Sequence, residues 1–217
     1  SGLLLPFTFG GFNPMVSFGL ALALWIVFSG LIGFAERLRH GSLGSLPRAF
    51  WGMQLAHFGM AWVVAGITLV SGFESERNVK MNIGDSTELA GYTFTFRGAS
   101  EHDGPNYRAA RGVLEVSKGG KPVVVLEPEK RIYNASGMPM TEAAIHYSFT
   151  RDVYAAMGEE LEGGAWTVRV FHKPFINWLW IGGLLMVIGG GLAAADRRYR
   201  IALKKAGAAT ENQGAQA

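Results

Sequence analysis

One histidine, His57, lies within WGMQLAHFGMAWVVAGITLV, residues 51–70, a run without formal charge that is about as long as a bilayer is thick. Ionisable groups in such runs are costly and usually face a bundle interior or a cavity. An imidazole there can hydrogen-bond to a neighbouring helix, or it can serve as an axial ligand of haem iron in a dry apolar pocket. The sequence alone leaves both interpretations open.

The neighbours of His57 at helical spacing form a large, soft and mostly apolar face, which favours the haem interpretation. The side chains expected to line a pocket with it are Met53, Gln54, Met60, Ala61 and Val64. Small residues in the same run would let another helix or a flat ligand come close: Gly52, Ala56, Gly59 and Gly66. His57 is therefore the candidate metal-binding residue, as a ligand of haem iron.

The other histidines have ordinary structural interpretations. We expect His40 to face headgroups from a loop, His102 to be solvated in a turn-rich loop, His146 to be half-buried in a strand, and His172 to lie at a membrane boundary. The acidic residues at 159, 160 and 162 form a carboxylate cluster, but they have no nucleophile or base partner. We interpret this cluster as a solvated loop and predict no catalytic residue.

Composition limits the possible class of protein. The chain has 217 residues, of which 49% are hydrophobic and only 17% are charged, which is too apolar for an ordinary soluble domain. A net charge of +3 does not indicate nucleic-acid binding. The sequence has no cysteine, so disulfides, thiolate metal sites and a cysteine nucleophile are excluded in this chain.

The elements that would position His57 are three transmembrane helices, predicted at residues 15–35, 50–72 and 174–196. Glycines at 182, 183 and 189–191 in the third helix are interpreted as a packing surface for a neighbouring helix.

Orientation in the membrane follows from the basic residues. The loop 36–49 contains arginines and the tail 197–217 is basic, which places both on the cytoplasmic side, and the tail is expected to be largely disordered. The segment 1–14 and the region 73–173 then lie outside. The start at Ser1 suggests the C-terminal piece of a longer membrane protein, or one half of a split one.

The region 73–173 is predicted to be a mostly antiparallel β domain, a small barrel or sandwich, between the second and third helices. Short alternating or β-branched runs predict strands at 92–96, 113–116, 123–126, 144–149 and 166–171. Lys118-Gly119-Gly120-Lys121 predicts a hairpin. Residues 152–161, DVYAAMGEEL, are expected to form a short helix or a turn.

Several motifs in one order resemble the C-terminal part of the CcmF family, the membrane haem lyase subunits of the cytochrome c maturation system. They are GMQLAHFGMAWVVAGI, SERNVKMNIGD, GPNYRAARG, EKRIYNASGMPMTEAAI, TRDVYAAMGEEL, WTVRVFHKPFINWLWIGGLLMVIGG and DRRYR. The resemblance extends from about Gly11 to Arg200.

The resemblance implies a multi-pass protein of the bacterial inner membrane, with the β domain in the periplasm. It implies attachment of haem to apocytochrome c at a CxxCH motif, with haem transported by a periplasmic haem chaperone. Further implied partners are thiol-handling subunits, the N-terminal part or chain of the same lyase, and quinol as an electron donor. The family also holds a transmembrane haem b, thought to reduce the incoming haem, and His57 matches one of its two axial ligands.

The other ligands and the tryptophan-rich haem-handling segment of the family are absent from this sequence, so we expect the chain alone to be inactive. One alternative is a non-catalytic membrane scaffold whose β domain docks partner proteins. A transporter fragment is disfavoured, because transporter sites use several polar groups near the midplane, whereas the apolar runs of the three spans contain a single ionisable residue, His57.

Overall fold

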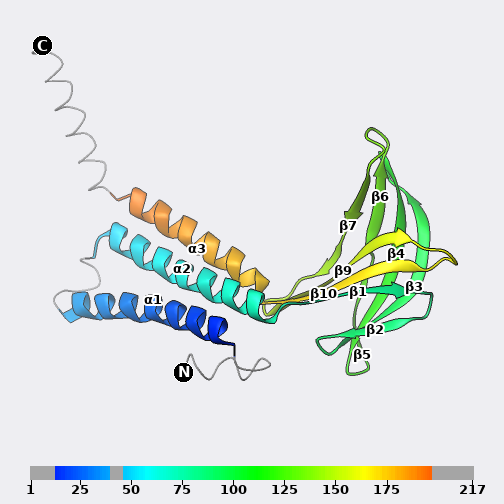
Figure 1. Ribbon diagram of the computed structural model, residues 1–217. Coiled ribbons are helices and arrows are strands. Elements are labelled where there is room, and N and C mark those ends of the chain that lie inside the picture. The colour runs from blue at the N-terminus through cyan, green and yellow to red at the C-terminus, as the bar shows by residue number, and fades with distance from the viewer. Residues whose placement is uncertain (1–12, 40–45, 197–217) are drawn as a thin grey trace, which may run out of the picture. The chain divides into compact units, whose positions relative to one another are not determined.

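The computed structural model describes residues 13–39 and 46–196, which form two compact units. One unit contains the helices, up to Thr68 and from Trp178 onward, and the other is the β unit, Leu69–Asn177 (Figure 1). The predictions for His40, for residues 1–12 and for the tail 197–217 concern positions outside the described residues.

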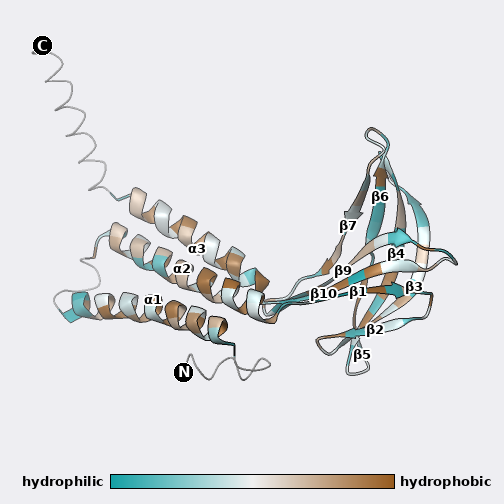
Figure 2. Ribbon diagram, viewed as in Figure 1, coloured by the Kyte–Doolittle hydropathy of each residue, from teal (hydrophilic) through white to brown (hydrophobic). Residues whose placement is uncertain are grey.

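The three helices are α1 (Pro14–Arg39), α2 (Arg48–Phe73) and α3 (Ile176–Ala194). Each is long and apolar enough to cross a membrane, and Figure 2 shows hydrophobic residues along all three. Asn13 caps α1, because its Oδ1 atom accepts a hydrogen bond from the backbone N–H of Met15 at 3.0 Å. α3 begins two residues later than predicted, since Pro174 belongs to the preceding strand.

Helices α2 and α3 pack through glycines seven residues apart. Gly52 and Gly59 of α2 lie against Gly189 and Gly182 of α3, respectively. The predicted packing role of the α3 glycines is confirmed for these two, which are buried. Gly183, by contrast, has no neighbour within 4 Å of the position a Cβ atom would take.

Helices α1 and α2 are joined by polar and aromatic contacts. Gln54 of α2 donates a hydrogen bond from Nε2 to the carbonyl oxygen of Gly30 in α1 at 2.8 Å. The rings of Phe34 and Phe50 stack with their centroids 6.3 Å apart. These contacts hold the first half of α2, which carries His57, against α1.

The β unit contains two antiparallel sheets. In the first sheet the order is β1 (Ser75–Met81), β10 (Trp166–Pro174), β9 (Arg151–Glu160) and β8 (Ala144–His146). In the second it is β2 (Ser86–Leu89), β3 (Tyr92–Asp103), β4 (Tyr107–Lys118), β6 (Glu129–Tyr133) and β7 (Pro139–Glu142), with β5 (Lys121–Leu126) also paired to β4. The predicted fold class is thus confirmed: three membrane-length helices, with an antiparallel β domain between the second and third.

The core of the β unit lies between the two sheets and follows the two-residue period of strands. Its fully buried side chains include Phe94, Phe96, Leu114, Val168 and Val170. The predicted hairpin is also confirmed: β4 and β5 pair across Gly119 and Gly120, whose φ angles are 56° and 76°. Positive φ at both central residues is what a two-residue turn of type I′ requires.

Two local predictions were wrong. Residues 152–161 form no helix or turn, because β9 spans Arg151–Glu160. Val153, Ala155 and Met157 alternate into the core, and pairing with β10 satisfies the backbone, so burial outweighs the helix preference of Ala, Met and Glu. His102 lies near the end of β3, opposite Ala109, and not in a loop.

Candidate functional site

An apolar groove between α1 and α2 contains the predicted ligand, His57. Its volume is about 360 Å³. From α1 it is lined by Ile26, Val27, Gly30, Leu31 and Phe34, and from α2 by Gln54, His57 and Phe58. The groove is open along one side, and the His57 side chain is exposed there within the helical unit.

The backbone of α2 determines which nitrogen of His57 is available. Its Nδ1 atom lies 2.8 Å from the carbonyl oxygen of Met53, one turn earlier in the helix. A carbonyl can only accept, so Nδ1 carries the proton and donates it, and in the neutral ring the lone pair is then on Nε2. A histidine that binds a metal typically donates its second N–H to a carbonyl or carboxylate in this way.

Gln54 is the other polar side chain in this groove. Its amide nitrogen is already engaged with the Gly30 carbonyl, so it ties the two helices together across the groove. The remaining lining is aliphatic or aromatic. The groove therefore offers one nitrogen ligand in apolar surroundings, which suits a flat apolar macrocycle held through its metal.

The structure places the other predicted lining residues differently. Met53 contributes its backbone carbonyl to His57, and its side chain is exposed. Met60 is also exposed. The backbone carbonyl of Val64 accepts a hydrogen bond from the Thr68 hydroxyl. Ala61 lines a second apolar groove of about 200 Å³, which shares Val27 and Phe58 with the first (its other lining residues are Leu20, Ala23, Leu24, Trp62, Ala65 and Trp178).

The α1 residues of the groove were missed by sequence reasoning. Any face of an apolar span can meet a neighbouring helix, and the first span has no ionisable residue to single out one of its faces. A single faint signal was available, the small residue Gly30, whose carbonyl oxygen accepts the hydrogen bond from the Gln54 amide. Only the packing of the two helices shows which residues face His57.

The apolar lining suits a haem macrocycle, and His57 would be the ligand that this chain supplies to it. Among the described residues of α1, α2 and α3, His57 is the sole histidine. A second axial histidine would have to come from outside these helices.

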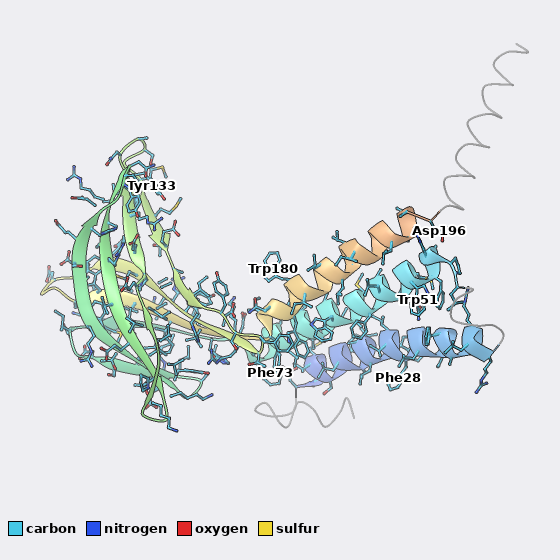
Figure 3. All side chains as sticks on the ribbon, turned by 180° about the vertical axis from the view of Figure 1, so that it is seen from behind. Phe28, Trp51, Phe73, Tyr133, Trp180 and Asp196 are labelled. Carbon is cyan, nitrogen blue, oxygen red and sulfur yellow. The ribbon has the colours of Figure 1, made fainter. Side chains whose placement is uncertain are left out.

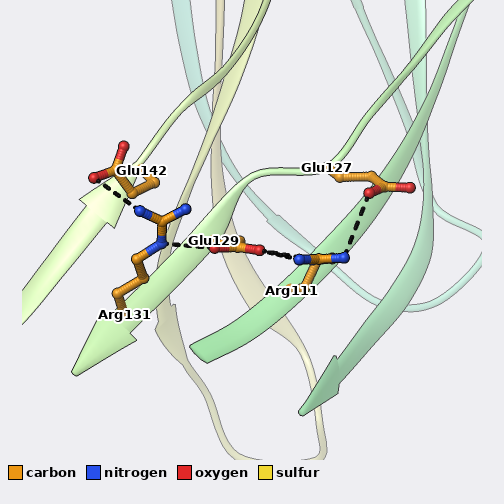
Figure 4. Close-up of polar contacts among 5 residues, drawn as sticks. All are labelled: Arg111, Glu127, Glu129, Arg131 and Glu142. Atoms are coloured by element: carbon orange, nitrogen blue, oxygen red, sulfur yellow. Dashed lines mark hydrogen bonds and ion pairs between the residues drawn. The ribbon is translucent and has the colours of Figure 1, made fainter. Parts of the chain in front are cut away.

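A charged cluster lies in the β unit around Glu129 (Figure 4). The side chain of Glu129 is 6% exposed. Its carboxylate accepts hydrogen bonds from Arg131 and Arg111, each at 2.7 Å. Burial on its own raises the pKa of Glu129, but the hydrogen bonds and charges of these arginines outweigh it and hold the pKa below its usual value. The cluster is an internal ion network that joins β4 to β6.

The predicted carboxylate cluster stays at the surface. Glu159 and Glu160 end β9, and they and Glu162 are exposed. Within residues 13–39 and 46–196, no group of three His, Asp or Glu side chains is arranged to hold a metal ion. His57 therefore remains the candidate for metal chemistry in the described part of the chain.

Comparison with known proteins gives several matches. Residues 72–174 match the family described as "CcmF C-terminal beta-sandwich". The chain is 50% identical over 200 residues to a cytochrome c-type biogenesis protein CcmF of Pseudomonas aeruginosa, covering 90% of this chain and 30% of that protein. The CcmF of Escherichia coli is 46% identical over 199 residues, covering 91% and 30%, respectively.

A solved structure titled "Cytochrome c Heme Lyase CcmF" has the same fold, with a TM-score of 0.73 at 21% identity. The match covers 88% of this chain and 33% of that one. The chain thus spans about 30% of the length of the curated relatives it matches.

Proposed function

Because this chain corresponds to the C-terminal part of the CcmF family of cytochrome c biogenesis proteins, we propose that it works within a membrane haem lyase and contributes His57 as one axial ligand of a haem b. The lyase attaches haem covalently to the CxxCH motif of apocytochrome c, taking it from a periplasmic haem chaperone. The protein lies in the inner membrane, with the β unit in the periplasm. The N-terminal part of the lyase and thiol-handling subunits complete the machinery.

The observation that carries this proposal is the hydrogen bond from His57 Nδ1 to the Met53 carbonyl, in a groove that is otherwise almost wholly apolar. This bond holds the ring in one orientation and, in the neutral ring, leaves the lone pair on Nε2. A histidine that served only to join helices would instead place its N–H on the neighbouring helix, as Gln54 does. The apolar side chains around it offer contact surface to a flat apolar ligand.

When bound, the haem supplies one-electron transfer, with quinol as the proposed donor and the iron of the incoming haem as the acceptor. The residues of this chain bind and orient it. Phe34 and Phe58 offer aromatic surface, while Gly30 provides room beside the α1 backbone. Met53 fixes the ligand tautomer through its carbonyl.

The test is the absorption spectrum of the detergent-purified lyase complex, oxidised and dithionite-reduced, with His57→Ala compared to wild type. We expect the reduced b-type spectrum to be lost in the variant, together with cytochrome c assembly, while membrane insertion is kept. Gly183→Ala is the matched control, because this helical position has open space around it. Wild-type haem content in His57→Ala would contradict the ligand role and leave His57 as a packing residue.

A further inference from the structure

Three basic side chains gather around one buried tyrosine at an end of the β-unit core. Arg151 of β9 and His172 of β10 share the inward strand face with Val153 and Val170. Lys118 of β4 shares that face with buried Val116. We call Lys118, Arg151, His172 and Tyr92 the cationic cluster.

Tyr92 is the centre of the cationic cluster and is only 2% exposed. The His172 ring stacks on it, with centroids 5.9 Å apart. The Lys118 Nζ atom lies 4.6 Å from the ring centroid and 3.4 Å from the Tyr92 hydroxyl, and the Arg151 Cζ atom lies 4.8 Å from the centroid. Cation–π contact gives both cations partial compensation without any carboxylate.

Two nitrogen atoms of this cluster have no hydrogen-bond partner within the described part of the chain. Arg151 Nη1 and His172 Nδ1 are buried and have no hydrogen-bond partner there. The ion pairs formed between described residues also include neither Lys118 nor Arg151. Burial and the charges of Arg151 and Lys118 lower the pKa of His172, as expected where positive charge is uncompensated.

Buried polar groups without partners are rare in native proteins, and unpaired buried charge is costly. An anion bound beside the exposed Lys118 would compensate this charge. Arginine and lysine together favour an oxyanion such as phosphate, because guanidinium bonds are directional and charge-assisted. The side chains of this cluster have the chemistry of a site for a phosphate-type ligand.

The cluster is close in sequence to the ends of two membrane helices. His172 is four residues before α3 begins at Ile176, so about 14 Å of extended chain at most separates them. Its strand partner Ser75 follows the end of α2 at Phe73 by two residues. Helices that cross a bilayer leave it at the headgroup layer, where phosphate is abundant.

Aromatic residues beside the first turn of α3 support the same location. The Ser148 carbonyl accepts a hydrogen bond from the Asn177 amide at 2.7 Å, which holds the segment 147–149 next to the start of α3. Tyr147 and Phe149 in this segment are 66% and 57% exposed. Exposed aromatic side chains at a span boundary are typical of membrane interfaces.

We propose that the cationic cluster binds the phosphate of a phospholipid headgroup and so anchors the β unit to the outer leaflet. This site is separate from the groove of His57, and it does not depend on the haem proposal. A free phosphate ion has the same chemistry, and the experiment distinguishes the two sources.

The test is native mass spectrometry of the full chain purified in detergent. Phosphatidylglycerol is added to one sample, and diacylglycerol with the same acyl chains is added to a parallel sample. The double variant Lys118→Gln/Arg151→Gln should bind phosphatidylglycerol at least tenfold more weakly than wild type. Arg108→Gln, an exposed position near the opposite end of β4, should bind like wild type. Diacylglycerol, which lacks the phosphate, should show no difference between the three proteins.

Two results would overturn the proposal. Unchanged phosphatidylglycerol binding in the double variant would remove the cluster as a site. Inorganic phosphate that saturates the site at the same concentration as phosphatidylglycerol would make the ligand a free anion and not a lipid. If circular dichroism shows that the double variant is unfolded, Lys118→Gln alone replaces it, because this side chain is at the surface, and a threefold or greater loss is then required.

Discussion

Gly59 of α2 and Gly182 of α3 lie back to back: a Cβ atom placed on either residue would come within 2.7 Å of the carbonyl oxygen of the other. Real Cβ atoms do not approach backbone this closely, so these positions admit only glycine at the present helix separation. The contact recurs one heptad away at Gly52 and Gly189. Close backbone approach of this kind is how membrane helices associate without a hydrophobic driving force between them.

Gly182→Val should separate α2 from α3. Besides the Gly59 carbonyl, the new side chain would meet Val63, whose Cγ2 atom would lie 2.6 Å from the added Cβ. Overpacking of this kind costs about 1–3 kcal/mol, so we expect a lower midpoint of thermal unfolding in detergent. Gly183→Val, one residue away in open space, is the matched control. Equal midpoints for the two variants would contradict the packing role.

Asp196→Ala should weaken the start of α2. The Oδ2 atom of Asp196, a residue that is 6% exposed, accepts a hydrogen bond from the Ala49 backbone N–H at 2.8 Å. That N–H is in the first turn of the helix, where amides have no intrahelical acceptor. Losing such a cap costs about 1 kcal/mol, measurable by denaturant unfolding of the full chain. Glu36→Ala, at an exposed position of α1, should have a much smaller effect.

Glu129→Ala should be among the most damaging single changes in the β unit. It would leave Arg111 and Arg131 facing each other without their shared carboxylate. Breaking a buried ion pair costs about 3–5 kcal/mol, and the partial exposure of both arginines favours the lower end. The measurement is the free energy of unfolding. Glu127→Ala is the control, because this 54% exposed residue reaches Arg111 only at 3.9 Å and should contribute under about 1 kcal/mol.

The Glu129 network also predicts acid sensitivity. Its folded pKa is below the usual 4.5, so its contribution to stability is fully present above that pH. The unfolded chain takes up the proton first as the pH falls, and the contribution is then lost progressively. Between pH 5 and pH 3 the free energy of unfolding should therefore fall further in wild type than in Glu129→Ala. The extra loss should correspond to the titration of one group. Parallel losses in the two proteins would show that Glu129 is not the group responsible.

His172 should titrate below the usual 6.5, because burial and the charges of Arg151 and Lys118 lower its pKa. The fold favours the neutral His172 ring. The contribution of this ring to stability is therefore complete above pH 6.5 and decreases as the pH falls toward the folded pKa. Ring-proton NMR shifts of the full chain in detergent would follow the titration. In the Lys118→Gln variant the pKa of His172 should rise, and a pKa that does not move would argue against the predicted charge contact.

The sequence by itself determined the class of the protein and its segments. Uncharged runs of bilayer length specify three helices, because a backbone in lipid must satisfy its own hydrogen bonds. Alternating residues such as those of YTFTF specify a strand with one buried face, and Gly119-Gly120 specifies a tight turn because both residues need positive φ. His57 also stands out without a structure, because one imidazole in an apolar span is costly.

Only the tertiary structure decided which segments meet. Residues 152–161 have helix-favouring side chains, and it is the ladder with β10 that makes them a strand. The groove partners of His57 on α1 and the meeting of Lys118, Arg151 and His172 around Tyr92 depend on residues far apart in the chain. Local patterns set the period and length of each element. Which elements become neighbours depends on which of them can bury their apolar surfaces against each other and bring their backbones close enough to pack.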